Sequence, residues 1–229
     1  MKKPAPKWDL LCKPAVFETL RAEESFWQIV ALARAVNALS FAHWVMEPAL
    51  KDKSQNGIRT RNNSFLFTCG VLYEALLLVE KMHKHFGRSE AFNNGLRKLS
   101  RDKTARKVRT SHLEPARNNV VFHFLPPSFG KLINIPGDYE CLFASGEGNI
   151  RKQIYYPFAD LIATEFLVGF AGDHKRFYDT LDTAMMEIRT LARSFADAAD
   201  HLIRESLAGW GFGMRITPAP TKRRQPTKR

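Results

Sequence analysis

Two side chains with complementary chemistry lie near the middle of the chain. Arg117 and His123 are six positions apart, and Asn118 follows Arg117 directly. Arginine stays charged at physiological pH, and its planar guanidinium matches the oxygens of a phosphate or a carboxylate. Histidine, with an ordinary pKa of about 6.5, can take up and release a proton near neutral pH. Together these residue types could hold a phosphate and move a proton beside it.

The stretch that carries these residues is expected to be a helix packed on one side. Ser111 and Glu114 have the spacing of a capping box, which predicts that the helix begins there. Pro126 and Pro127 prevent its continuation past Leu125. A rotation of about 100° per residue gathers four apolar side chains on one face. They are Leu113, Val120, Val121 and Phe124.

Arg117 falls in the middle of this apolar stripe, and His123 lies at its margin. A buried guanidinium without a partner is costly, because it cannot lose its charge. Arg117 is therefore either paired with a carboxylate, such as Glu74 or Glu80 of the preceding helix, or directed into a polar cavity. The paired alternative makes the protein a helical interaction module.

The sequence Arg117-Asn118-x4-His123 resembles the R-polar-x4-H signature of the HEPN family. These helical domains include metal-independent ribonucleases of prokaryotic defence and toxin systems. A second pair, Arg106 and His112, has the same spacing but is followed by Lys107 and lacks the apolar stripe. The specific resemblance covers only residues 117–123.

The resemblance implies an all-α antiparallel helical bundle and a metal-independent endoribonuclease without a cofactor. Arg117 would bind the phosphate, Asn118 would position it, and His123 would transfer a proton while the RNA 2′-hydroxyl attacks. A homodimer would join two such helices in one cleft, and a cognate antitoxin or regulatory protein is a further partner that the family allows. In one subgroup a tyrosine, the target of an inactivating antitoxin, stands where this chain has Leu125, so that form of control is not expected.

Positive charge is concentrated in the residues that lead into this helix. The net charge is +12. Basic clusters attract phosphate chains because binding releases counterions. We therefore expect nucleic-acid contacts from Arg97, Lys98, Arg101, Lys103, Arg106, Lys107 and Arg109. A second basic cluster, in the Pro- and Thr-rich residues 222–229, is interpreted as a solvated tail.

Composition indicates a globular protein, since 229 residues with 45% apolar content can bury a core. Three scattered cysteines suggest reduced thiols, and no apolar segment follows the N-terminal lysines as in a secretory signal. The most apolar stretch, 161–171, is too short to cross a bilayer. We expect a cytoplasmic protein that does not bind membranes.

Apolar spacing predicts helices over residues 15–50 (as one helix or a pair), 60–85, 92–99, 158–170 and 175–208. The expected organisation is an N-terminal arm at 1–14 and a single helical domain at 15–213. An insertion at about 126–157 is expected to form a long loop or a small β-hairpin, and 214–229 a basic disordered tail.

Two other functions compete with the ribonuclease. Glu80 and His83 have the Glu-x-x-His spacing of di-iron bundles, but no second such pair is present, so we expect no metal site. A non-catalytic module of the same fold would bind nucleotide, nucleic acid or a partner protein without turnover.

Overall fold

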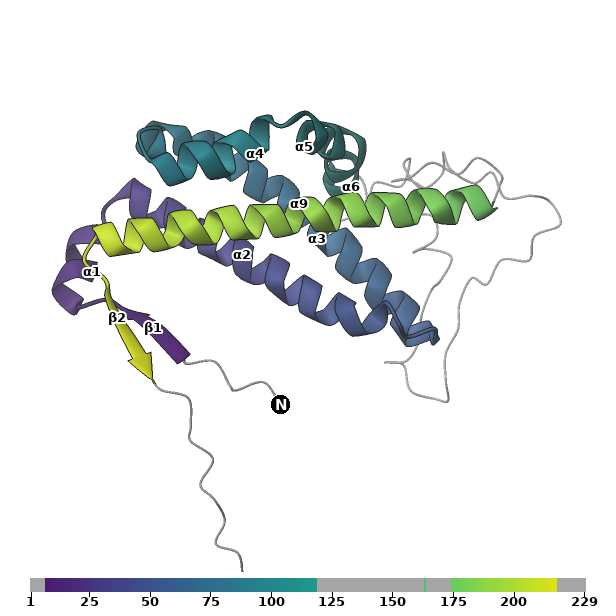
Figure 1. The fold of residues 1–229 in the computed structure, drawn as a ribbon, viewed down its shortest axis with the longest axis horizontal. Coiled ribbons are helices and arrows are strands. Elements are labelled where there is room, and N and C mark those ends of the chain that lie inside the picture. The colour runs from purple at the N-terminus through teal and green to yellow at the C-terminus, as the bar shows by residue number, and fades with distance from the viewer. Residues whose placement is uncertain (1–6, 119–162, 164–173, 218–229) are drawn as a thin grey trace, which may run out of the picture.

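The computed structural model describes residues 7–118, Ala163 and 174–217 (Figure 1). Within these residues the fold is all-α with one two-stranded antiparallel sheet, which confirms the predicted fold class. The elements are β1 (Lys7–Leu11), α1 (Pro14–Leu20), α2 (Glu24–Ala49), α3 (Gln55–Phe86), η1 (Phe92–Arg97), α4 (Lys98–Arg101), α5 (Lys103–Val108), η2 (Arg109–Leu113), α6 (Glu114–Ala116), α9 (His174–Gly209) and β2 (Gly213–Thr217); η1 and η2 are π-helical.

The helices α2 and α3 form an antiparallel hairpin with a short connector. Ser54 caps α3, because its hydroxyl accepts a hydrogen bond from the backbone N–H of Gly57 at 3.2 Å. A side chain at Gly57 would clash, since a Cβ there would lie 2.3 Å from the backbone oxygen of Asp52. Because Ser54 is the cap, the helix that was expected from residue 60 starts earlier, at Gln55.

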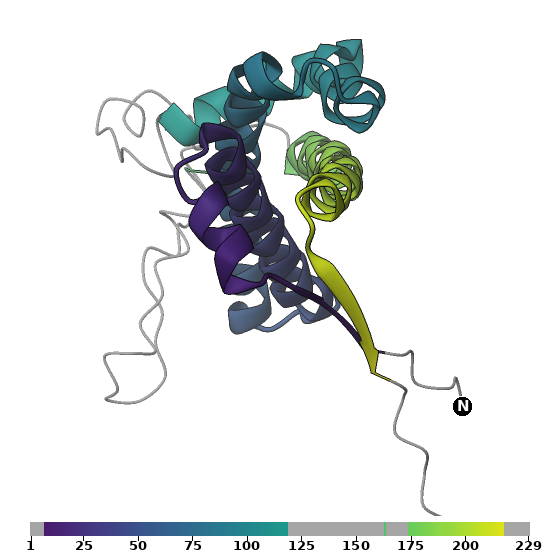
Figure 2. The same ribbon diagram turned by 90° about the vertical axis from the view of Figure 1, so that its left-hand side faces the viewer.

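The long helix α9 lies between the α2–α3 hairpin and the η1–α5 region and contacts both. It packs against α2 and α3 on one side and against η1 and α5 on the other (Figures 1 and 2). Gly95 of η1 permits a close approach, because a Cβ there would lie only 3.3 Å from the Cβ of Ala198. The core contains large side chains from α2, α3, η1, η2 and α9, including Ile29, Leu32, Leu72, Met82, Phe92, Leu96, Leu113, Ile188, Phe195 and Leu202.

The sheet pairs the two ends of the described chain, with Lys7 opposite Thr217 and Leu11 opposite Gly213. Gly211, with a φ of 82°, turns the chain from α9 into β2. The N-terminal arm expected at 1–14 contains β1. The tail expected to be disordered from residue 214 begins with β2, so that prediction is wrong for residues 214–217. Strand pairing between such distant segments leaves no local signal in either one.

The segment between residues 103 and 118 is helical throughout, so the prediction that a helix begins at Ser111 is wrong. Asp102 provides the cap, because its Oδ1 accepts the backbone N–H groups of Thr104 at 2.8 Å and Ala105 at 3.0 Å. Ser111 lies inside η2, where the N–H of Glu114 bonds to the oxygen of Arg109, five residues back. This π-turn directly precedes Pro115, which has no N–H to donate.

The other helix predictions have clear outcomes where residues are described. The 15–50 region forms a pair, α1 and α2, and the helix expected at 92–99 is the π-helical η1 followed by α4. The long helix expected at 175–208 is α9. His123, the 126–157 insertion and, apart from Ala163, the 158–170 helix lie outside the described residues.

One helix among the described residues, α2, is long and apolar enough by composition to cross a membrane. Core helices of globular domains pass the same test. One face of α2 packs into the core through residues such as Leu32, Leu39 and Met46.

Candidate nucleic-acid interface

Arg117 lies near the end of the described helical segment and contacts α3. Its Nε donates to Glu74 Oε1 at 2.7 Å, and its Nη1 donates to Asn118 Oδ1 at 3.0 Å. The structure thus brings two of the three predicted site residues together and provides the carboxylate partner that the alternative interpretation named. The Arg117 and Glu74 side chains are 31% and 46% exposed, so water reaches the pair.

Arg109 forms a second ion pair with α3, two helical turns earlier. Its Nη1 donates to Glu80, and its guanidinium carbon lies 5.6 Å from the ring centroid of Tyr73. Burial opposes the charge, but Glu80 and Tyr73 together raise the pKa of Arg109 above its usual value. Arg109 was predicted to bind nucleic acid; in the structure it holds η2 against α3.

Arg97 is also held in place by the fold. Its Nη1 donates to Asn93 Oδ1 at 2.9 Å, and the amide of Asn93 donates to the backbone oxygens of Gly87 at 2.8 Å and Ser89 at 2.9 Å. This network ties η1 to the end of α3. Arg97 therefore has a structural partner within the predicted binding set.

The other five predicted residues form an exposed set of cations, which we call the basic ridge. No carboxylate among the described residues forms an ion pair with any of them. The ridge consists of Lys98, Arg101, Lys103, Arg106 and Lys107, all exposed, on α4 and α5. Their charges are therefore available for an anionic partner.

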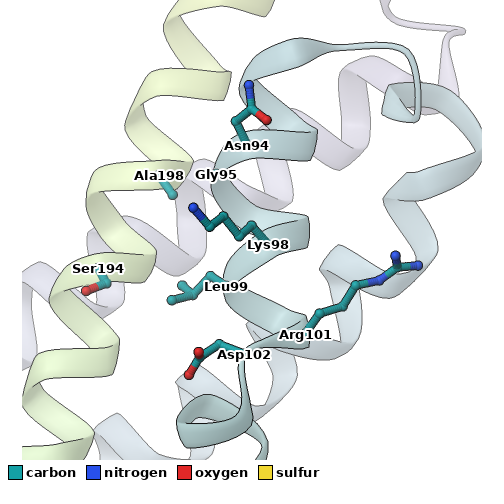
Figure 3. A pocket seen from close by; sticks show the side chains of 8 residues that line it. All are labelled: Asn94, Gly95, Lys98, Leu99, Arg101, Asp102, Ser194 and Ala198. Atoms are coloured by element: carbon teal, nitrogen blue, oxygen red, sulfur yellow. The ribbon is translucent and has the colours of Figure 1, made fainter.

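A shallow hollow of about 640 Å³ lies between the start of the ridge and α9. Figure 3 shows Lys98 extending toward α9, while Arg101 points away from it. Ser194 and Ala198 of α9 form the opposite wall, and Asn94 lies at one end. Asp102 also borders the hollow, where its carboxylate is engaged as the cap of α5.

His112, the histidine of the second Arg–His pair, lies beside α9. Its Nε2 is 3.9 Å from Glu187 Oε2 of α9, and both side chains are mostly buried. The sequence pattern gave no reason to pair residues of η2 and α9. In the structure His112 links these two elements.

A second hollow, also about 640 Å³, lies between α2 and α9 and was not predicted. Arg189 of α9 donates to Glu47 of α2 at 2.9 Å within it, and His43 lies 4.0 Å from the same carboxylate. The two helices are far apart in the sequence, so periodicity could not have shown that these side chains meet.

Metal binding finds no support among the described residues, where no three His, Cys, Asp or Glu side chains are grouped to hold an ion. Glu80, proposed for a Glu-x-x-His pair, is bonded to Arg109. His83 stacks on Phe92 with ring centroids 6.3 Å apart.

No known protein family, curated protein or solved structure matches the chain. The HEPN resemblance therefore rests on residues 117–123 alone.

Proposed function

We propose that this protein binds RNA along the basic ridge and cleaves it without a metal ion. The observation that carries the proposal is a set of five cations without an ion-pair partner in the described part of the chain. Lys103, Arg106 and Lys107 lie on the same continuous helical segment as Arg117, and Lys98 and Arg101 lie on α4, which directly precedes that segment. Neutralising phosphates with such side chains releases counterions and favours binding. RNA would approach over α4 and α5 and reach the Arg117 region at the other end of the segment.

In the proposed reaction the RNA supplies its own nucleophile. The 2′-oxygen attacks the adjacent phosphorus, the bond from phosphorus to the 5′-oxygen breaks, and a 2′,3′-cyclic phosphate and a 5′-hydroxyl result. His123 would transfer the proton, and Arg117 would stabilise the negative charge that develops on the phosphate oxygens. A homodimer with two motif helices in one cleft would provide a second histidine, so that one acts as base and the other as acid. Such an enzyme would act in the cytoplasm.

The ion pair with Glu74 is compatible with this role. A pair as exposed as Arg117 and Glu74 contributes only about 0–1 kcal/mol to stability. A bidentate arginine–phosphate contact is stronger than an ordinary hydrogen bond. A phosphate could therefore replace the carboxylate at little cost.

The same ion pair also favours a second candidate, an RNA-binding module without turnover. In that case Arg117 would only link its helix to α3, and the ridge would bind RNA that leaves unchanged. This alternative predicts salt-sensitive binding but no products.

The test is cleavage of a mixed RNA pool in EDTA by the wild type and by His123→Ala, after purification that removes host nucleases. Cyclic-phosphate products from the wild type alone would support the ribonuclease. Binding without products, from folded protein, would support the second candidate. Equal cleavage by both proteins would contradict the assignment of His123.

A further inference from the structure

The solvent-facing side of α2 carries a continuous row of residues, which we call the α2 stripe. It consists of Trp27, Val30, Arg34, Asn37, Phe41, Trp44 and Pro48, which alternate in steps of three and four. Trp44 is 72% exposed and Phe41 is 59% exposed. Single exposed apolar residues are normal on a protein surface, but a row about 32 Å long at this spacing is typical of a helix that packs against another helix.

We propose that the α2 stripe binds the same stripe of a second copy of this chain, with the two helices antiparallel. The pattern is self-complementary. If both helices are centred on Asn37, Val30 lies beside the partner's Trp44, and Arg34 lies beside the partner's Phe41. Trp27 then lies beside Pro48 of the partner subunit. A two-fold interface of this kind uses one patch on both subunits.

The two polar residues of the stripe indicate why a protein partner fits it. Arg34 and Asn37 have no side-chain hydrogen bond or ion pair among the described residues. In the antiparallel pair the two Asn37 amides meet on the two-fold axis and can bond to each other, and each Arg34 can stack on an aromatic ring. A single polar position of this type also fixes the register of paired helices.

A lipid surface fits the same residues poorly. A helix that lies on a membrane keeps its charged residues on the face away from the lipid, whereas Arg34 and Asn37 are in the centre of the apolar row. Full insertion would also expose the opposite face of α2, where Leu32, Leu39 and Met46 are buried in the core. The stripe therefore matches another protein helix better than a bilayer.

This interface is separate from the one implied by the family resemblance, in which the helices that carry Arg117 meet. It contains no residue of the basic ridge and none of the Arg117 helix. It stands whether or not the protein cleaves RNA.

The first test is the molar mass of the full-length protein from about 1 to 100 µM by analytical ultracentrifugation. We expect self-association through α2, either of single chains or of dimers already joined through the Arg117 helices. The dissociation constant of this step should rise at least about 30-fold in the Phe41→Ser/Trp44→Ser variant, since a central tryptophan commonly contributes 2 kcal/mol or more. Met186→Ser is the matched control, because Met186 is 64% exposed on α9 and lies outside the stripe. A wild type that stays monomeric over this range would overturn the proposal, as would equal effects of the two variants.

The second test locates the two-fold axis by a disulfide. Cys12 and Cys141 are replaced by serine, while Cys69 can stay because it is fully buried, which raises the pKa of its thiol well above the usual range. Asn37→Cys should then cross-link two subunits under mild oxidation, and Ser40→Cys, on the side of α2 that faces α9, should not. A dimer that cross-links through neither position, or a stripe that instead carries the protein onto anionic vesicles, would contradict the interface.

Discussion

Arg109 and Arg117 differ from the basic ridge in what they contact, although all lie in one stretch of about twenty residues. The two arginines face α3, where Arg109 is bonded to Glu80 and Arg117 to Glu74. The later arginine pairs with the earlier glutamate, so this segment runs antiparallel to α3. The ridge residues face solvent on α4 and α5 and have no carboxylate partner among the described residues.

The comparison shows that charge density in a sequence does not distinguish structural cations from available ones. A cation that meets a carboxylate on a neighbouring helix adds to the packing of the fold, whereas an unpaired one adds to the surface potential. Whether a cation is paired or available depends on the face of the helix that it occupies. The π-turn η2 changes the face on which every later residue of the segment lies.

The largest effect should come from neutralising the basic ridge. Replacing Lys98, Arg101, Lys103, Arg106 and Lys107 with glutamine should lower RNA affinity on the order of 100-fold or more at low salt. The slope of log affinity against log salt should fall by up to about 3.5, or 0.7 for each phosphate that is no longer neutralised. Fluorescence anisotropy with a labelled RNA over a salt series measures both the affinity and the slope.

The matched control removes five exposed charges elsewhere. Lys13, Lys51, Lys53, Lys81 and Arg88 are exposed and outside the ridge. Their replacement by glutamine should leave most of the affinity in place. Equal losses in the two variants would mean that net charge alone governs binding, and the ridge would have no special role.

The next largest effect concerns the paired side of the comparison. Arg109→Met removes the bond to Glu80 and the stacking on Tyr73, and we expect a loss of about 1–3 kcal/mol in the free energy of unfolding. Urea unfolding measures this loss. RNA affinity of the folded variant should change little, whereas Lys107→Met should show the reverse behaviour. A large loss of affinity in Arg109→Met without a loss of stability would contradict the structural role.

Asp102 lies among the ridge residues and caps α5 through its carboxylate. Two substitutions can distinguish the contribution of the capping oxygen from that of the negative charge. Asp102→Ala removes the cap of α5 and should cost about 1 kcal/mol of stability, while Asp102→Asn keeps a capping oxygen and should cost less. Thermal unfolding by circular dichroism compares the two. Equal losses would indicate that the charge, rather than the cap, is what α5 requires.

The smallest effect concerns Lys84, an exposed lysine that, unlike the lysines of the ridge, has a carboxylate partner, Glu24. Hydrogen bonds from His85 and Lys84 lower the pKa of the Glu24 carboxyl below its ordinary value. Any stability from this group is present above the ordinary pKa of a glutamate and is lost as the pH falls through the lowered value. An NMR titration should show the lowered pKa in the wild type and its return toward the ordinary value in His85→Gln/Lys84→Gln. An unchanged pKa in that variant would contradict the assigned cause.

Much of the fold could be predicted because it follows from local periodicity. The spacing of apolar residues located α9 to within one residue at each end. It also predicted helix over residues 15–50, as one helix or a pair, where the structure has the pair α1 and α2. The cap at Asp102 was missed because Ser111 and Glu114 offered a stronger local pattern, and the π-turn has no sequence signature. The pairing of β1 with β2 depends on contacts between the two ends of the chain, which periodicity does not report.

The candidate site could also be predicted only in part, where local sequence patterns were enough. Sequence located the basic stretch and named Glu74 or Glu80 as a possible carboxylate partner for Arg117, and the structure pairs Arg117 with Glu74. It could not separate Arg97 and Arg109 from the ridge, because their partners, Asn93 and Glu80, are determined by how the helices face each other.

The most direct test of the central claim compares Arg117→Ala with Glu74→Gln for RNA cleavage in EDTA. Both substitutions break the same ion pair, but only the first removes the proposed phosphate-binding group. If Arg117 acts on RNA, cleavage should fall by about 100-fold or more in Arg117→Ala and stay equal or rise in Glu74→Gln. If cleavage falls equally in both variants, or the wild type does not cleave at all, Arg117 serves only to hold its helix against α3.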